Sequence, residues 1–212
     1  YTNFENCCSG IKRRISIVNM EDWFEKNYTR LVEIRRYLHQ HPELGFEEYN
    51  TTDYLKNLLK QSGYKIILNE KMATGFYCEY GSGSSKILGI RCELDALPIF
   101  DKKEVEYRSK NDGLMHACGH DVHMAIVTGV ALWLKDNNIQ LPGIIRFIYQ
   151  PGEEKAPGGS IKMIAAGAVD NLDHLIAIHI LPSMNATKIG IKSGPMAAAV
   201  SLLQITLNGP GG

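Results

Sequence analysis

Apolar residues recur every three or four positions over two early stretches of the chain, as they do along one face of an amphipathic helix. In the first stretch, about residues 22–40, they are Trp23, Tyr28, Leu31, Ile34, Tyr37 and Leu38. The second stretch, about residues 47–62, is followed by Gly63, a residue typical of helix C-caps. The same spacing predicts two further helices, over about 121–136 and 160–166.

Short apolar runs between these helices predict strands. They cover about residues 64–68, 75–80, 87–94, 143–149 and 174–178. Because the later strands alternate with helices, we expect an α/β fold whose sheet is mostly parallel and covered by helices. Residues 81–85, rich in glycine and serine, predict a turn, and since no helix follows them they do not form a phosphate-binding loop.

The two ends of the chain depart from this pattern. Residues 1–19 show no periodicity, and Met20 opens the first helix. We therefore expect Met20 to be the natural start and residues 1–19 to be a leader or upstream segment outside the fold. Residues 202–207 have the pattern of a strand but no partner follows them, so we expect the chain to be cut at that end.

Composition narrows the class of protein. The 212 residues are 44% apolar and carry 23 basic and 23 acidic side chains, as in a soluble globular protein. Without excess positive charge, we expect no binding to nucleic acid or to membrane surfaces. No apolar run reaches the roughly 20 residues of a membrane span, and no secretion signal opens the chain, so we expect a cytoplasmic protein. The five cysteines, an odd number without paired spacing, predict no disulfide framework.

Polar residues follow three of the predicted strands at their carboxyl ends. Asp95 follows the strand over 87–94, Gln-Pro-Gly-Glu-Glu (150–154) follows 143–149, and His179 follows 174–178. In open α/β sheets, ligands bind in the crevice beyond the carboxyl ends of the strands. We therefore expect these polar residues to meet at one site.

The densest group of reactive side chains is His-Ala-Cys-Gly-His-Asp-Val-His (116–123). Cys118 and His120 stand just before a predicted helix, and Gly119 between them lets the backbone turn tightly. A thiolate with an imidazole and carboxylates favours Zn²⁺, Co²⁺, Ni²⁺ or Mn²⁺ over Ca²⁺ or Mg²⁺. A buried cysteine beside solvated histidines and a cysteine nucleophile activated by histidine are the alternatives. A zinc deaminase is excluded, because its Pro-Cys-x-x-Cys motif is absent.

Glu153 and Glu154 form the second element of the candidate site. Adjacent glutamates are commonly just part of a solvated loop, but these two follow a buried strand and Pro-Gly. In an extended turn their side chains diverge, so one can bind a metal while the other exchanges a proton with water and with a leaving amine. This division of roles is typical of metal-assisted amide hydrolysis.

The remaining polar residues have more than one interpretation. His179 is a candidate ligand because of its position beside the other strand ends. Asp95 and Asp121 are expected to orient an imidazole or, for Asp121, to cap the following helix. His116 and His123 either bind near the metal or simply line the pocket.

Five motifs, in this order, resemble those of a known family. They are His-Pro-Glu-Leu-Gly-Phe-Glu-Glu (41–48), Leu-Asp-Ala-Leu-Pro (94–98), Met-His-Ala-Cys-Gly-His-Asp-Val-His (115–123), Gln-Pro-Gly-Glu-Glu (150–154) and Ile-His (178–179). The chain resembles, from about Met20 to its end, the metal-dependent amidohydrolases of the hippurate hydrolase and auxin-conjugate (IAA-amino acid) hydrolase branch, relatives of aminoacylase. It departs from the family pattern at Glu93, Val122 and Gly152.

The resemblance implies a zinc-peptidase-like catalytic domain with two divalent metal ions (Zn, Mn, Co or Ni). By this resemblance, the family's metal ligands match Cys118, His120, Glu154 and His179, and the family's general base matches Glu153. The implied substrate is a small N-acyl amino acid, whose amide is hydrolysed. The alternatives are an N-acetyldiaminopimelate deacetylase or small-peptide hydrolase of the same family.

Members of that family are nearly twice as long as this chain. By resemblance, residues 20–194 form the N-terminal part of the catalytic domain, and residues 195–212 begin an α+β lid and dimerisation domain with its first strand. The full-length form is then expected to be a homodimer. The alternative is that this chain is an inactive fragment, or one that only binds metal.

Overall fold

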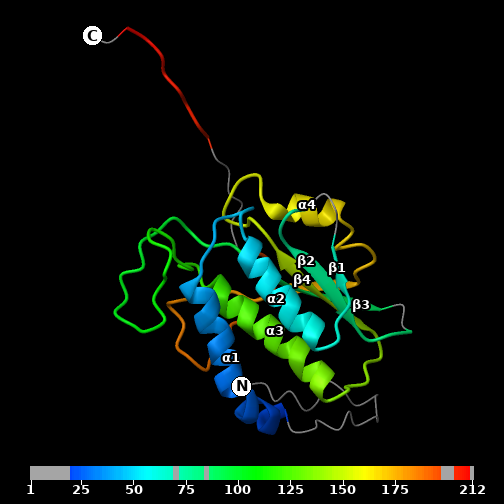
Figure 1. Ribbon diagram of the computed structural model, residues 1–212. Coiled ribbons are helices and arrows are strands. Elements are labelled where there is room, and N and C mark those ends of the chain that lie inside the picture. Colours follow the sequence, from blue (N-terminus) through cyan, green and yellow to red (C-terminus); the bar gives the residue numbers. More distant parts are fainter. Residues whose placement is uncertain (1–19, 69–71, 84–85, 197–202, 211–212) are drawn as a thin grey trace. The chain divides into compact units, whose positions relative to one another are not determined.

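The computed structural model describes residues 20–68, 72–83, 86–196 and 203–210 (Figure 1). It divides into two compact units, the first ending at Ile180 and the second beginning at Leu181. The sequence predicted a boundary after residue 194, and the assignment of 20–194 and 195–212 to two domains stays a prediction. The predicted leader, residues 1–19, lies outside the described residues.

Four helices form where the apolar spacing predicts them. They are α1 (Met20–Gln40), α2 (Tyr49–Gln61), α3 (His120–Asp136) and α4 (Gly159–Ala165). The second helix begins two residues later than predicted, because the chain after Pro42 first makes a turn in which Phe46 adopts a left-handed φ of 68°.

The strands are β1 (Ile66–Ile67), β2 (Phe76–Tyr80), β3 (Ile87–Glu93), β4 (Ile144–Gln150) and β5 (His174–Ala177), in the spatial order β1-β2-β4-β3-β5. The three strands β4, β3 and β5 are parallel, whereas β2 pairs antiparallel with β4 and β1 pairs antiparallel with β2. The predicted α/β class and helix-covered sheet are confirmed, and the sheet is mixed. The parallel part is the part that carries polar residues at its carboxyl ends.

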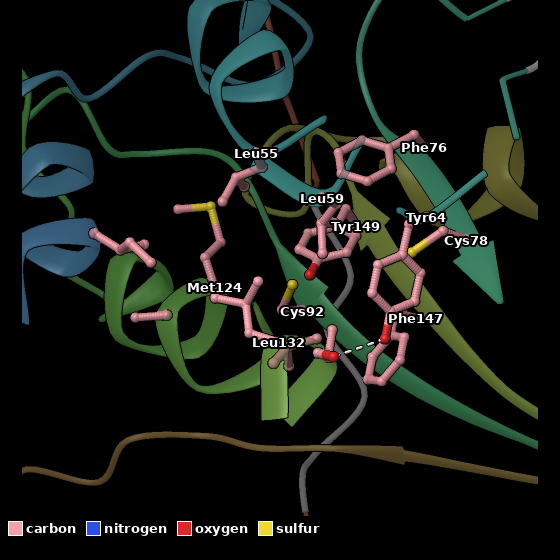
Figure 2. Close-up of a cluster of buried hydrophobic side chains, with 14 of the residues drawn as sticks. Leu55, Leu59, Tyr64, Phe76, Cys78, Cys92, Met124, Leu132, Phe147 and Tyr149 are labelled. Carbon is pink, nitrogen blue, oxygen red and sulfur yellow. Dashed lines mark hydrogen bonds between the residues drawn. The ribbon is translucent and has the colours of Figure 1, made fainter. Parts of the chain in front are cut away.

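Helices cover both faces of the sheet (Figure 1). Phe147 and Tyr149 of β4 join the large core with α1, α2 and α3, shown in Figure 2. Ile148, between them, points to the other face and packs with Met163 of α4. This alternation follows from the two-residue repeat of a strand. Burying such side chains contributes roughly 1.5–3 kcal/mol each to the stability of the fold. The sheet therefore holds the loops at its edge in defined positions.

The described residues of the second unit, 181–196 and 203–210, contain neither helix nor strand. The predicted strand over 202–207 is therefore not formed at 203–207, and Leu202 lies outside the described residues. A strand exists only through hydrogen bonds to a neighbour, and within the described residues nothing pairs with this segment. Its apolar side chains Leu203, Ile205 and Leu207 are accordingly exposed.

None of the helices in the described ranges combines the length and the apolar character that crossing a bilayer requires.

Candidate metal centre

The candidate site lies at the carboxyl ends of the three parallel strands. Glu93, the last residue of β3, pairs with Gln150, the last residue of β4. Ala177, the last residue of β5, pairs with Arg91 of β3. Because these three strands end side by side, the segments that follow them begin at one edge of the sheet, as the sequence predicted.

Gly119 brings the fourth segment to the same edge. It adopts a left-handed φ of 91° and precedes His120, the first residue of α3. Few side chains tolerate this backbone conformation, and a Cβ at this position would also lie 3.3 Å from Ile180. The tight turn expected between Cys118 and His120 is therefore present.

The four predicted ligands come together in the structure. The candidate ligand atoms of Cys118, His120 and Glu154 all lie within 4.8 Å of one another. Nε2 of His179 lies 3.6 Å from Sγ of Cys118, and Nε2 of His120 lies 3.9 Å from Oε1 of Glu154. Residues from α3, the loop after β4 and the segment after β5 thus surround one point.

Both histidines of this group turn an unprotonated Nε2 toward the other candidate ligands. Nδ1 of His120 lies 2.8 Å from the carbonyl oxygen of Asp95, and Nδ1 of His179 lies 2.8 Å from that of Ile180. A carbonyl oxygen only accepts, so each Nδ1 carries the proton and each Nε2 carries a lone pair. Metal-binding histidines are held in this way, with the other N–H donated to a carbonyl or carboxylate.

Asp95 connects the first turn of α3 to the loop that follows β4. Its Oδ2 accepts a hydrogen bond from the backbone N–H of Glu154 at 2.8 Å, and its Oδ1 lies 3.4 Å from Nδ1 of His120. Burial alone would raise the pKa of Asp95, but these hydrogen bonds outweigh it and lower the pKa. Asp95 is therefore an ionised carboxylate that orients an imidazole, the placement expected for it.

Asp121 serves a different part of the molecule from the one predicted. The N-cap of α3 is Gly119, without a side-chain cap, so the capping role is wrong. The Asp121 carboxylate instead accepts from Nδ1 of His39 at 2.7 Å and forms an ion pair with Arg35, whose Nε lies 2.9 Å away. As the second residue of α3, its side chain turns toward α1 and orients a histidine outside the candidate centre.

Glu153 stands beside the proposed ligands, with Oε2 3.9 Å from Nε2 of His120. Its side chain is 41% exposed, so it can meet a ligand entering from solvent. Burial and, next, the negative charge of Glu154 raise its pKa above the ordinary value. A carboxylate with a raised pKa is suited to accept a proton and release it again.

The donor set fits divalent transition metals. Burial and the charges of Glu154 and Glu153 raise the pKa of the Cys118 thiol to about 12, so its neighbours are acidic. A cation at this point would relieve the repulsion and favour the thiolate. Sulfur, two imidazole nitrogens and a carboxylate are ligands of Zn²⁺ and neighbouring divalent ions.

The two ambiguous histidines differ from each other. His123 has both ring nitrogens bonded: Nδ1 lies 2.8 Å from Glu93 Oε2, and Nε2 lies 3.0 Å from the backbone nitrogen of Ile180. His116 is buried, and neither of its nitrogens has a hydrogen-bond partner among the described residues. Burial lowers the pKa of His116 to about 4, so it is neutral.

Sequence reasoning did not assign a role to Glu93, beyond noting its departure from the family pattern. Burial would raise the pKa of Glu93, but the hydrogen bond from His123 and the charge of Arg91 lower it. An acidic residue at the carboxyl end of a strand that is apolar except for Arg91 was the signal available for it.

Known proteins resemble this chain over most of its length. An N-acetyl-L-cysteine deacetylase of Bacillus subtilis is 40% identical over 183 residues, covering 86% of this chain and 44% of that protein. An N-acyl-L-amino acid amidohydrolase of Geobacillus stearothermophilus is 37% identical over 184 residues, covering 87% and 50%. This chain thus spans about half the length of these relatives.

A solved structure agrees with them. The Bacillus subtilis YXEP protein, described as a dinuclear metal binding peptidase from the M20 family, has a TM-score of 0.77 and 38% identity, covering 81% of this chain and 48% of that one. The model of peptidase family M20/M25/M40 matches residues 89–208, more than half of this chain. The chain therefore belongs to peptidase family M20/M25/M40.

Proposed function

We propose that this chain carries the metal site and the proton-transfer group of an amidohydrolase that cleaves N-acyl amino acids into a carboxylic acid and a free amino acid. The observation that carries the proposal is the convergence of Cys118 Sγ, a Glu154 oxygen and the unprotonated Nε2 atoms of His120 and His179. Relatives that are named for N-acyl amino acid substrates support it.

The proposed ligands of two divalent ions (Zn, Mn, Co or Ni) are Cys118, His120, Glu154 and His179. The solved relative described as dinuclear supports the number of ions. Bound there, such ions would supply Lewis-acid activation of water and of the substrate carbonyl. The work of the protein is to hold the ligands, which it does through the carbonyl groups of Asp95 and Ile180.

Glu153 is the proposed general base. It takes a proton from the attacking water and then delivers that proton to the amine nitrogen as the C–N bond breaks. Its raised pKa and its 41% exposure fit both steps. Glu154, its neighbour in the sequence, is the proposed ligand, so the two carboxylates divide the roles.

The proposed substrate is a small N-acyl amino acid, and an acetylated diaminopimelate or a small peptide is the alternative within the same chemistry. A cytoplasmic location is proposed because Cys78, Cys92 and Cys118 are free thiols, as expected in a reducing compartment. A homodimer of the full-length form stays a prediction from the resemblance.

The direct test loads the purified chain with Zn²⁺, Mn²⁺, Co²⁺ or Ni²⁺. Bound metal is counted by elemental analysis, and amino-acid release is measured from a panel of N-acetyl and N-benzoyl amino acids. We expect Glu153→Gln to lose about 100-fold or more in turnover, the usual range for loss of a general base, while its metal content stays unchanged. Near-normal turnover in this variant would contradict the assignment of the base.

A second candidate is a chain that binds metal but does not hydrolyse. It is favoured by the extent of the match, because the chain spans only 44% and 50% of the two relatives compared. Stoichiometric metal without release of any amino acid from the panel would support this candidate. Absence of metal binding would contradict both.

A further inference from the structure

His123 lies beside the candidate centre and joins three of the elements that form it. It is the fourth residue of α3, and its side chain is fully buried. Its Nδ1 contacts Glu93 at the end of β3, and its Nε2 contacts the backbone of Ile180, the residue after His179. One imidazole thus links α3, β3 and the segment that follows β5.

These two partners fix the proton on the ring. The backbone N–H of Ile180 can only donate, so Nε2 of His123 carries a lone pair and accepts. Nδ1 then carries the proton and donates it to Glu93. Although Glu93, His120 and His123 offer ligand atoms within 4.8 Å of one another, both nitrogens of His123 are engaged by the protein and offer no lone pair to a metal.

His179 needs support that the sheet does not give. The last pairing of β5 joins Ala177 to Arg91, two residues before His179. β5 lies at an edge of the sheet and all four of its residues are exposed, as is His179. An exposed side chain beyond an edge strand has many rotamers open to it, and ordering it costs free energy.

The backbone of Ile180 carries the restraint from His123 to His179. Its N–H donates to His123, and its carbonyl oxygen accepts from Nδ1 of His179 at 2.8 Å. The orientation of this one residue therefore decides where Nε2 of His179 points. The rings of His123 and His179 also touch, with centroids 5.3 Å apart and planes at 60°, which limits rotation of the exposed ring.

Glu93 is itself anchored. Arg91 donates to Glu93 Oε1 at 2.5 Å and to Gln150 Oε1 at 2.8 Å. Gln150 ends β4 just before the loop that carries Glu153 and Glu154. The restraint on His179 thus starts in the sheet and not in a mobile surface group.

We propose that His123 is a positioning residue, which holds the backbone of Ile180 and so directs Nε2 of His179 at the metal position beside Cys118. This inference rests on the proposed function, because it concerns a ligand of the proposed centre. Its consequence is that removal of His123 weakens metal binding through His179 alone.

The test is a Co²⁺ titration of the unchanged chain, His123→Leu, His179→Ala and the double variant. We expect His123→Leu to weaken binding about 10–100-fold, as loss of a group that orients a ligand does. The double variant should bind within about threefold of His179→Ala, since both changes remove one interaction. The thiolate-to-cobalt absorption should persist in His123→Leu, because Cys118 is untouched, while the ligand-field bands shift toward those of His179→Ala.

Two further variants separate positioning from ligation and from general damage. The amide of His123→Gln can accept from Ile180 and donate to Glu93, so it should restore binding to within a few-fold of the unchanged chain. Thr128→Val is the matched control: Thr128 is equally buried on α3 and bonds Tyr149 instead, 3.0 Å away. Its Co²⁺ affinity should not change.

Each contrary result has a distinct meaning. The positioning role is wrong if His123→Leu binds Co²⁺ as tightly as the unchanged chain. It is also wrong if the double variant loses as much Co²⁺ binding free energy as the two single variants together. Equal losses in His123→Leu and His123→Gln would make His123 a ligand. Should His123→Leu not fold, Glu93→Ala must lose affinity for the proposal to stand. If the unchanged chain binds no Co²⁺, the proposed function itself fails.

Discussion

Two groups of histidine and acidic side chains lie on either side of the first turn of α3, and they differ in what the protein leaves free. On the side that faces α1, both ring nitrogens of His39 contact carboxylates. Nδ1 lies 2.7 Å from Asp121 and Nε2 lies 3.1 Å from Asp101. Arg35 and Lys103 add positive charge to this group. On the side of the candidate centre, His120 and His179 each turn an unprotonated Nε2 toward the other proposed ligands.

The balance of charge differs in the same way. No lysine or arginine within the described ranges forms an ion pair with Glu153 or Glu154. The group around His39, which we call the buried network (Arg35, His39, Asp101, Lys103 and Asp121), is balanced by its own side chains. The same residue types therefore form ion pairs with one another where both signs of charge are present, and can bind a cation where acidic side chains have no basic partner.

The largest expected effect is on the buried network. Asp121→Ala leaves Arg35 and His39 facing a buried position without a carboxylate, since the side chain of Asp121 is fully buried. Removing one partner of such a group costs about 3–5 kcal/mol in the free energy of unfolding. Urea unfolding in the presence of a chelator measures this cost. A loss below about 1 kcal/mol would mean that the network is not balanced by Asp121.

The next-largest effect concerns the candidate centre, where we expect a large change in metal affinity and little change in stability. Cys118→Ala should weaken Zn²⁺ or Co²⁺ binding by more than about 100-fold, because even groups that merely orient a ligand are worth about 10–100-fold. The unfolding free energy of the metal-free chain should change little, since Cys118 is only half-buried.

Cys92→Ala is the matched control for that experiment. Cys92 is a free thiol with no exposed surface, in the large core. Its loss should cost about 1 kcal/mol of stability and leave metal binding unchanged. Loss of metal in both variants would show that the centre depends on general integrity of the fold, and the comparison between the two regions would fail.

A third prediction uses pH. Burial alone would raise the pKa of Asp101, but the backbone N–H groups of Ser109 and Lys103 and the charge of Lys103 lower it from 3.8 to about 2. A carboxyl group with a lowered folded-state pKa contributes stability above pH 3.8, and this contribution is lost as the pH falls toward 2. The contribution is about 2 kcal/mol at neutral pH.

The comparison of interest is between the unchanged chain and Asp101→Asn, because other carboxylates titrate in the same range. The two unfolding free energies should differ by about 2 kcal/mol at pH 7 and converge near pH 2. A difference that stays constant between pH 7 and pH 2 would assign the effect of Asp101 to packing or hydrogen bonding instead of its charge.

Local patterns predicted much of this architecture from the sequence. Apolar spacing placed the helices, and the rule for carboxyl ends of parallel strands placed Asp95, Glu153, Glu154 and His179 at one edge. The insertion of β4 between β2 and β3 was beyond such patterns, because alternation identifies a strand but not its neighbour. The direction of the Asp121 side chain depended on His39, 82 residues away. The engagement of both nitrogens of His123 likewise required Ile180, 57 residues later.

The smallest expected effect concerns His116, which belongs to neither region. It is 3% exposed, both of its nitrogens lack a partner among the described residues, and burial keeps it neutral. A buried polar group without a partner costs about 1–3 kcal/mol, and an apolar side chain of similar shape avoids that cost. His116→Leu should therefore raise the midpoint of urea unfolding by an amount that corresponds to about 1 kcal/mol, with no change in the dependence on denaturant. Destabilisation by the same amount would show that the imidazole of His116 has a polar partner in solution. His116 would then be a polar residue of the candidate site and not an unsatisfied group in the core.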